Sequence, residues 1–508
     1  FLASIERNHR ILALLLLLFF AYQSVALISL WSPTGEERMT VGTGLIYLQT
    51  GEVHGDYPPL IQTYLALPYA LGLAQFEIFT NDPPIYARYA NLLLALLCAM
   101  LLYFLALKSA GPLGAITALF IFALSPNILA NSAIATVDVG AAFLALLFMA
   151  LLEFTWQQDS AKFDALAGLG LGLAISAKFE NMALLAITIL VALFKLYGNR
   201  KLLSRIGRHL LVLFALAWLV FCLCYGFTGL FVSKGPMRSA PMLRPISSLM
   251  PTQAYIGLGE SLAHNSKSPP PFVGGHRDER TRKYYLPIIF SLKTPIGVLL
   301  LLLLVLGCLK DGYFLKDKRF PFTLLPPLVF FLFLWLFDFP NRGYRQILPI
   351  LLLLYLLLAQ LTKKELRQGI IAGPTIVLSL VLILGSWWDQ SPHHLSYVNT
   401  FAPFVSAEPF VFTGADCDWG QNEYLLAKEM SKMPKSILKY INPHPSTVPL
   451  AGAIAINANN YVQTLAPTIP AYDWLALMKP YKILAGTWAL YVVSEKDLRE
   501  QAGRLEDR

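Results

Sequence analysis

Long apolar segments alternate with short polar ones along almost the whole chain. A run of roughly 18 or more apolar residues is long enough to cross the hydrocarbon core of a bilayer as a helix. The pattern therefore predicts a mainly α-helical, polytopic membrane protein with about eleven transmembrane helices. The predicted spans are 11–31, 91–107, 112–130, 138–155, 164–178, 182–197, 208–232, 286–309, 321–337, 346–361 and 369–388.

The basic residues between the spans fall mainly in every second loop, which suggests an orientation. Lys and Arg are enriched in the cytoplasmic loops of membrane proteins. We therefore expect the N-terminus in the cytoplasm and residues 389–508 on the extracytoplasmic (periplasmic) side of the inner, or cytoplasmic, membrane. The first span follows basic residues but precedes no small-residue cleavage site, so we expect a retained anchor. The cytoplasmic set is Arg7, Arg10, Lys108, Lys162, Arg200, Lys201, Arg205, Arg208, Lys310, Lys316, Lys318, Arg319, Lys363, Lys364 and Arg367.

The pattern of spans divides the chain into two parts. Residues 1–388 are predicted to form the transmembrane domain, with larger outer loops at 32–90 and 233–285. Residues 389–508 contain turn-rich segments and strand-like runs such as WALYVVS at 488–494. Alternating apolar residues of this kind are typical of a half-buried strand. We therefore predict a small α/β extracytoplasmic domain at the C-terminus.

Composition agrees with a membrane protein. The chain has 508 residues, of which 56% are hydrophobic and 14% charged, whereas soluble proteins are about 25% charged. The net charge of +9 does not predict nucleic-acid binding, because the basic residues lie mostly in loops beside membrane spans. Four of the five cysteines lie in or beside apolar runs, so no disulfide framework is predicted.

Three acidic residues on the expected outer side are candidates for chemistry. Glu36 and Glu37 follow the first span, where a carboxylate can accept a proton from an attacking hydroxyl. The alternative is that both are solvated loop residues with no role in chemistry. Asp138 interrupts an apolar stretch at the start of the 138–155 span. It can act as a helix cap, as a functional carboxylate, or as both.

Five cations on the outer side run against the positive-inside bias. Either anionic lipid headgroups or a specifically bound phosphate can explain them, since Arg and Lys bind phosphate well. The candidate phosphate-binding residues are Arg88, Lys178, Lys293, Arg342 and Arg345.

A polar cluster, DCDWGQNEYLL, occupies residues 416–426 of the C-terminal region. Asp416, Asp418, Trp419 and Gln421 either have a functional role or form a turn before a helix that starts near Gln421. No Walker motif, dinucleotide-binding glycine motif, HExxH or CxxC is present, so ATP, nicotinamide and structural zinc are not predicted. His393 and His394 are adjacent rather than at helical ligand spacing, so no metal site is predicted there.

Six segments in order resemble the GT-C membrane glycosyltransferases, and within them the protein-mannosyltransferase-like group (glycosyltransferase family 39). The similarity extends over nearly the whole chain. The segments are SPTGEERMTVGTGLIYLQTGE with YPPL, LSPNILANSAIATVDVGAAFL, GLGLGLAISAKFE, KYYLPIIFSLKTPIG, NRGYRQILPILLLL, and HHLSYVN followed by DCDWGQNEYL.

This resemblance implies a sugar donor on a polyprenyl phosphate and an acceptor hydroxyl on a protein, lipid or glycan. Glu36 or Glu37 would be the base, and Asp138 would position the acceptor or the base. The five cations would hold the phosphate, with membrane lipids around them. No nucleotide is needed, a divalent cation at the phosphate is left open, and further membrane subunits are allowed as partners.

The chain departs from the family pattern at three positions where histidine is expected. It has Thr40, Tyr57 and Gln346 there, and Glu36 where Asp is usual. The departures motivate a second hypothesis, a catalytically inactive membrane subunit that binds lipid or a partner protein. A transporter is a third hypothesis. Transporters tend to have charged residues near the middle of the bilayer, whereas the charged residues of this chain cluster at one predicted face.

Overall fold

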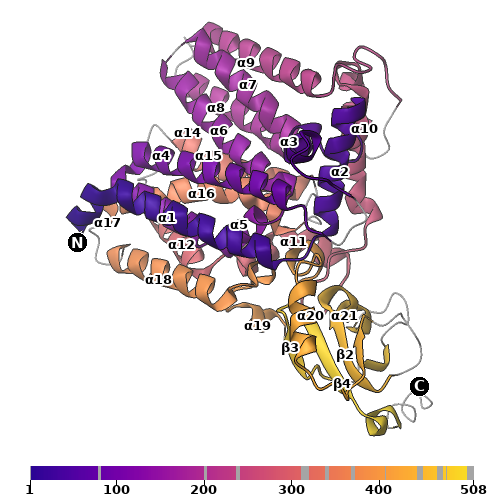
Figure 1. The fold of residues 1–508 in the computed structure, drawn as a ribbon. Helices are drawn as coiled ribbons and strands as arrows, with labels where there is room; N and C mark the ends of the chain where they lie inside the picture. Colours follow the sequence, from indigo (N-terminus) through magenta and orange to yellow (C-terminus); the bar gives the residue numbers. More distant parts are fainter. Residues whose placement is uncertain are drawn as a thin grey trace.

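The protein is a helical body with a small mixed sheet at one end (Figure 1). The computed structural model describes residues 2–77, 82–158, 160–198, 203–235, 241–310, 320–337, 343–367, 372–406, 408–442, 450–465, 473–475 and 478–499. The α-helices are α1 (Leu2–Leu30), α2 (Gly35–Thr50), α3 (Pro59–Ala70), α4 (Ile85–Ala123), α5 (Pro126–Ser132), α6 (Val137–Gln158), α7 (Ala161–Ala177), α8 (Ala183–Gly198), α9 (Leu203–Cys224), α10 (Thr252–Lys267), α11 (Glu279–Lys293), α12 (Ile296–Lys310), α14 (Phe320–Thr323), α15 (Leu325–Leu336), α16 (Leu348–Ala359), α17 (Lys364–Arg367), α18 (Ala372–Gln390), α19 (Ala402–Val405), α20 (Glu423–Ser431) and α21 (Ala458–Leu465).

Short 3₁₀ helices and four strands complete the described elements. The 3₁₀ helices are η1 (Phe179–Met182), η3 (Pro241–Leu249), η5 (Tyr344–Ile347), η6 (Gln360–Thr362), η7 (His394–Ser396), η8 (Gly414–Asp416) and η9 (Asp473–Leu475). The strands are β1 (Lys439–Ile441), β2 (Gly452–Asn457), β3 (Lys482–Leu484) and β4 (Trp488–Val493). The mainly α fold with a small α/β C-terminal region, predicted from the apolar pattern, is confirmed.

The described residues contain seven helices that are long and apolar enough to cross a membrane. The count rises to eight if α11 and α12, bent by 106° at their junction, form one broken span. The chain is thus an integral membrane protein, but the predicted count of eleven is not confirmed. The seven segments are Ser4–Leu30, Ile85–Ala123, Val137–Gln158, Phe179–Tyr197, Leu203–Cys224, Tyr344–Thr362 and Ala372–Gln390.

One part of the difference in count arises in α4. The sequence predicts two spans, 91–107 and 112–130, where the structure has one helix with a break at Gly111. Gly111 has φ 78 and ψ −175, a backbone conformation that glycine adopts without strain. Pro112 follows it and cannot donate a backbone hydrogen bond. The two predicted spans therefore correspond to the parts of α4 before and after the break at Gly111.

Small residues let α7 pack directly against α9. A Cβ atom on Gly168 would lie 2.7 Å from the carbonyl oxygen of Leu213, and one on Gly172 would lie 2.7 Å from that of Ala217. Small residues allow close backbone approach between helices in membranes. The GLGLGLAIS run therefore fixes the end of α7, where Lys178 follows.

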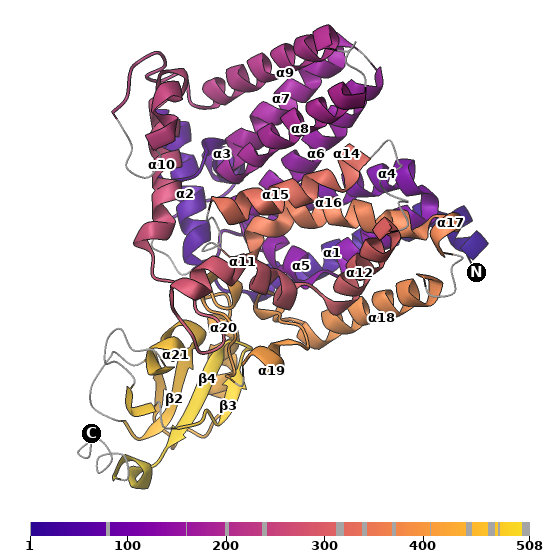
Figure 2. The same ribbon diagram turned by 180° about the vertical axis from the view of Figure 1, so that it is seen from behind.

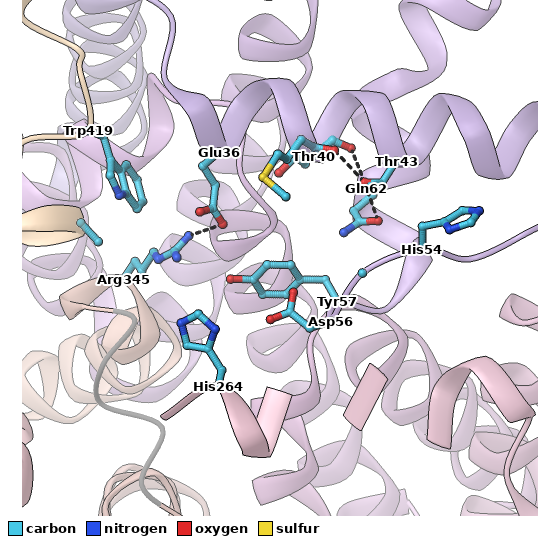
Figure 3. Close-up of a pocket in the computed structure, with 13 residues that line it drawn as sticks. Glu36, Thr40, Thr43, His54, Asp56, Tyr57, Gln62, His264, Arg345 and Trp419 are labelled. Atoms are coloured by element: carbon cyan, nitrogen blue, oxygen red, sulfur yellow. Dashed lines mark hydrogen bonds and ion pairs between the residues drawn. The ribbon is translucent and has the colours of Figure 1, made fainter. Parts of the chain in front are cut away.

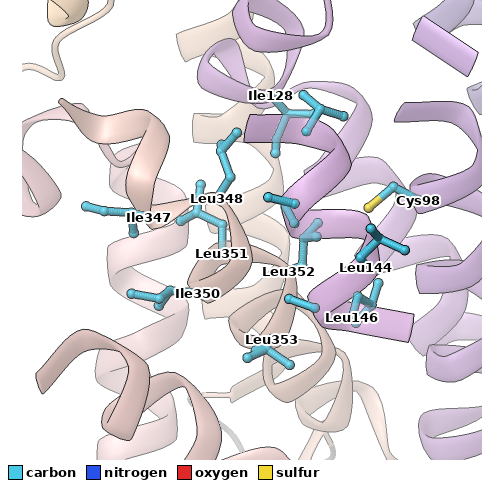
Figure 4. Close-up of a cluster of buried hydrophobic side chains, with 14 of the residues drawn as sticks. Cys98, Ile128, Leu144, Leu146, Ile347, Leu348, Ile350, Leu351, Leu352 and Leu353 are labelled. Atoms are coloured by element: carbon cyan, nitrogen blue, oxygen red, sulfur yellow. The ribbon is translucent and has the colours of Figure 1, made fainter. Parts of the chain in front are cut away.

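The centre of the helical body is the buried helix α16. In the apolar segment Tyr344–Thr362, which contains α16, 94% of the most apolar stretch is buried inside the molecule. Helices α4, α6 and α15 pack around α16. Figure 4 shows its leucines, including Leu351 and Leu352, interleaved with residues such as Ile128 and Leu144. Close packing resists displacement. The 3₁₀ turn η5 at the start of α16 is therefore held on a rigid base.

The sheet lies in the C-terminal region and has the order β1-β2-β4-β3. Strands β1 and β2 are parallel, and the other two pairs are antiparallel. Figures 1 and 2 show this region at one end of the helical body, beside α11. The loop before α20 joins it to the end of α1, since Ser32 donates its backbone N–H to Gln421 at 2.9 Å and its hydroxyl accepts from the Tyr424 N–H at 2.8 Å.

Candidate functional site

An open cavity of about 460 Å³ lies where the first outer loop, α10, η5 and the C-terminal region meet (Figure 3). Its walls therefore come from segments up to several hundred residues apart in the chain. The lining residues are Glu36, Met39, Thr40, Thr43, His54, Gly55, Asp56, Tyr57, Gln62, His264, Arg345, Ala415 and Trp419.

The charged pair of this cavity is Glu36 and Arg345. Nη1 of Arg345 lies 2.8 Å from Oε1 of Glu36 and 3.4 Å from Oδ2 of Asp138. The guanidinium carbon also lies 4.6 Å from the centre of the Trp419 ring, within the range of a cation–π contact. Arg345 is 7% exposed and the Glu36 side chain 24% exposed, so Glu36 is the member of the pair that solvent reaches.

Behind Arg345 lies a buried network of alternating charges. Lys178 contacts Asp138 at 2.8 Å and Glu180 at 3.2 Å, and Gln346 donates to Glu180 at 3.2 Å. Lys178 is placed there because the helix breaks after α7, with Lys178 itself extended at φ −162 and ψ 138. The network supplies compensating charge on both sides of Arg345, as buried ions require.

Glu37 and Arg88 form a separate, fully buried unit. Arg88 donates from Nε to Glu37 at 2.7 Å and from Nη2 at 2.8 Å, and its other contacts go to the backbone carbonyls of Ile28, Trp31 and Ser32. All five N–H groups of the guanidinium therefore have acceptors. Glu37 also accepts from the Thr34 N–H, closing a capping box at the start of α2.

This arrangement keeps both groups away from the cavity, although both are candidates by sequence. Neither the Glu37 carboxylate nor the Arg88 guanidinium is exposed to solvent. Neither lines the cavity. Their geometry therefore gives them a structural role in the segment 32–90.

Asp416 fixes the turn that carries Arg345. Its Oδ1 accepts the N–H of Tyr344 at 2.7 Å, and its Oδ2 accepts the hydroxyl of Tyr285. Lys293 donates to the carbonyl oxygens of Asp416 and Leu395, and its Nζ is 3.9 Å from Oδ1 of Asp416. The Lys293 ammonium is thus held inside the protein, away from the residues that line the cavity.

The adjoining loop places Trp419 over Arg345. Gln421 accepts the Trp419 N–H at 2.7 Å and donates to the carbonyl of Cys417 at 3.0 Å. Asp418 accepts the Gly420 N–H at 2.8 Å, and burial raises the pKa of the Asp418 carboxyl to about 6. The DWGQ segment therefore has a structural role that the sequence interpretation allowed, and one of its members, Trp419, also faces the cavity.

The predicted phosphate candidates therefore separate in space. The structure brings Lys178 and Arg345 together around Asp138, whereas Arg88 and Lys293 lie in other buried clusters. Arg342 lies outside the described residues.

The carboxylates near the cavity do not form a metal site within the described part of the chain. No group of three or more His, Cys, Asp or Glu residues is arranged to hold an ion there. Glu36, Asp138 and Glu180 each contact Arg345 or Lys178 instead. Burial lowers the pKa of His394 to about 4, which favours its neutral form. Glu36, Asp138 and Glu180 are thus already paired with cations of the chain itself.

Sequence reasoning missed several residues of the cavity. His54, Asp56 and His264 line it, and Figure 3 shows the Tyr57 ring extending toward the Glu36–Arg345 pair. Asp56 and His54 lie in the predicted loop 32–90, and His264 lies on α10 in the predicted loop 233–285. None of the three was singled out from the sequence. Glu180 was detectable as a charge two residues after Lys178.

The comparisons with known proteins agree with the sequence resemblance. Residues 66–225 match a family model described as dolichyl-phosphate-mannose-protein mannosyltransferase. The resemblance of this chain to the protein-mannosyltransferase-like GT-C group is thus confirmed over that segment. A comparison with curated protein sequences gives no match.

Several solved structures are similar at low sequence identity. The Saccharomyces cerevisiae protein O-mannosyltransferase Pmt1–Pmt2 complex bound to the sugar donor shares 16% identity, with a TM-score of 0.36, over 53% of this chain and 38% of that chain. The Archaeoglobus fulgidus oligosaccharyltransferase in the apo form shares 12%, with a TM-score of 0.44, over 73% and 54%. ArnT from Cupriavidus metallidurans in the apo state shares 14%, with a TM-score of 0.34, over 93% and 97%. The chain thus spans less than two thirds of the first two proteins.

Proposed function

We propose that the protein is a membrane glycosyltransferase that moves a sugar from a polyprenyl-phosphate donor to an acceptor hydroxyl on the extracytoplasmic face. The observation that carries this proposal is the Glu36–Arg345 pair at the wall of an open cavity. A base and a phosphate-binding cation are the two groups that such a transfer requires. The family match over residues 66–225 supports the same reaction class.

In the proposed reaction the acceptor oxygen forms a bond to the anomeric carbon of the sugar. The bond from that carbon to the phosphate oxygen breaks, and polyprenyl phosphate leaves with the electron pair. Glu36 takes the proton of the acceptor hydroxyl. Its partial exposure and its place on the first turn of α2 give an acceptor access to the carboxylate.

Arg345 is the proposed contact for the donor phosphate. Its guanidinium presents planar N–H donors, a geometry that suits phosphate oxygens. A bound phosphate would supply the negative charge that Glu36 now supplies to Arg345. The Glu36 carboxylate would then be available to the acceptor hydroxyl, while Asp138, itself paired with Lys178, would still contact Arg345.

A transfer assay with the purified full-length chain tests the proposal. It uses a panel of radiolabelled polyprenyl-phosphate sugars and a total envelope extract as acceptor. Label covalently attached to an acceptor by the wild type, and lost in Asp138→Asn, is the expected result. Label released only as free sugar would show that the chain hydrolyses donors and does not transfer.

The three missing histidines favour one second candidate, an inactive subunit that binds lipid. Gln346 is buried and donates to Glu180, and Thr40 and Tyr57 line the cavity. None of the three supplies an imidazole to the site. Binding of polyprenyl phosphate by a folded protein without transfer from any donor in the panel would support this second function.

A further inference from the structure

A second, smaller cavity of about 180 Å³ lies between the start of α11 and the loop that precedes α20. Ala415 lines both this cavity and the one that contains Glu36 and Arg345. The two cavities therefore meet at one residue of the same loop.

Arg277 places a positive charge in the lining of the smaller cavity. Its Nε is buried and has no hydrogen-bond partner within the described ranges, and no carboxylate there forms an ion pair with it. Burial lowers the pKa of the Arg277 guanidinium, but an arginine stays charged at physiological pH. A partly buried cation without a counter-ion is unfavourable, and an anionic ligand would relieve the cost.

The carboxylate in the same cavity does not neutralise Arg277. Asp416 accepts from Tyr344 and Tyr285, and the Lys293 ammonium lies 3.9 Å from Oδ1. Both oxygens and the charge of Asp416 are therefore engaged elsewhere. Two hydroxyl groups, of Ser268 and Thr413, line the cavity as further hydrogen-bond donors.

The backbone around Arg277 is fixed on both sides. Before it, Val273 and His276 form an isolated bridge, and Gly274 donates its N–H to Val411 at 2.9 Å. After it, Asp278 caps α11 through the Thr281 N–H at 2.7 Å. The arginine is therefore held at the cavity by ordered structure, as a binding residue requires.

We propose that Arg277 binds an anionic group, a phosphate or a carboxylate, which the acceptor carries near the hydroxyl that receives the sugar. The inference rests on the proposed glycosyl transfer and names the chemical class of its acceptor. The anion would sit at Arg277, the acceptor would pass Ala415, and its hydroxyl would reach Glu36. Arg345 remains the site of the donor phosphate, so the two anions have separate cations.

Kinetics of the full-length chain test this assignment. In the transfer assay, Arg277→Gln should raise the apparent KM for the envelope acceptor about ten- to a hundredfold, the usual effect of losing a charge-assisted hydrogen bond. The KM for donor and the kcat should stay within about twofold, and Arg277→Lys should recover part of the loss. The matched control is Arg280→Gln, because Arg280 is an exposed arginine three residues along the chain. An equal loss for donor and acceptor would overturn the proposal.

Competition with two probes identifies the source of the anion. Inorganic phosphate and dodecyl phosphate in micelles should both inhibit the wild type competitively with acceptor, and Arg277→Gln should remove this inhibition. Inhibition by dodecyl phosphate alone would assign the site to a lipid-borne anion. Inhibition competitive only with donor would place anion binding at Arg345 and overturn the proposal.

A binding measurement keeps the inference testable if no donor supports transfer. The thermal midpoint of the full-length protein in detergent is compared in phosphate and in chloride at equal ionic strength. Phosphate also stabilises folded proteins in general and can bind at Arg345, so the variants are compared with one another. Smaller stabilisation of Arg277→Gln than of the wild type and Arg280→Gln would support an anion site at Arg277 even where glycosyl transfer fails. Equal stabilisation of all three proteins would refute that site whatever the outcome for transfer.

Discussion

Glu36 and Glu37 are consecutive residues, yet one lines an open cavity and the other has no solvent exposure. Glu36 pairs with Arg345 at 2.8 Å across more than three hundred residues of sequence. Glu37 pairs with Arg88 at 2.7 Å inside the outer loop. The acidic pair therefore divides into a group available for chemistry and a group that holds the loop in shape, and this division makes distinct predictions.

Replacing Glu37 with Gln should damage stability. The change leaves the buried Arg88 guanidinium without its counter-charge, and breaking a buried ion pair in this way costs about 3 kcal/mol or more. We expect a clearly lower thermal midpoint in detergent. Glu36→Gln is the matched control, because its carboxylate is partly exposed, and its midpoint should stay close to wild type. Equal midpoints for the two variants would contradict the division of roles.

Arg345→Lys should weaken donor binding although it keeps the charge. Lysine cannot reproduce the planar contact with Trp419 or reach Glu36 and Asp138 together in the same geometry. We expect a donor KM about tenfold higher, with a smaller change in the KM for acceptor. Measuring both constants under the same conditions checks this, and a larger effect on acceptor would remove Arg345 from the donor site.

Gly343→Ala should displace the turn that carries Arg345. Gly343 has φ +91, and an added Cβ would lie 2.9 Å from Oδ2 of Asp416. Both the backbone strain and the clash act on the residue before Tyr344, at a cost of about 1–3 kcal/mol. We expect a lower thermal midpoint together with reduced transfer. Gly385→Ala serves as control, since nothing lies within 4 Å of the added atom there.

Part of this site follows directly from the sequence. Glu36, Asp138, Lys178 and Arg345 stand out because charges beside apolar runs are costly and therefore conspicuous. The long apolar runs likewise predict the membrane-spanning helices of the fold.

The rest of the site depends on tertiary contacts. The burial of Arg88 against three backbone carbonyls, and the place of His264 at the cavity wall, depend on segments far apart in the chain. The number of spans also depends on detail that hydropathy does not give, such as the break at Gly111 within α4.

Asp418→Asn should change how stability depends on pH. The pKa of this carboxyl is about 6 in the folded chain, above the reference value of 3.8, because burial disfavours its charge. The ionised form therefore lowers stability above about pH 6, and this loss disappears as the pH falls below 4. Removing the ionisation should stabilise the protein by up to about 3 kcal/mol at pH 8, since each pKa unit is worth about 1.4 kcal/mol.

The control for this change is the wild-type profile itself. The midpoints of wild type and Asp418→Asn should converge near pH 4 and separate as the pH rises through 6. A difference that stays constant over this range would mean that the Asp418 carboxyl does not titrate as its burial implies.

The central claim is that Glu36 accepts the proton of the acceptor hydroxyl. The most direct measurement is the turnover of wild type and Glu36→Gln at saturating donor and acceptor, with donor binding and thermal midpoint measured on the same samples. We expect kcat to fall by a factor of about 100 or more, the usual contribution of a general base, while donor affinity and midpoint remain near wild type. Unchanged turnover in Glu36→Gln would contradict it.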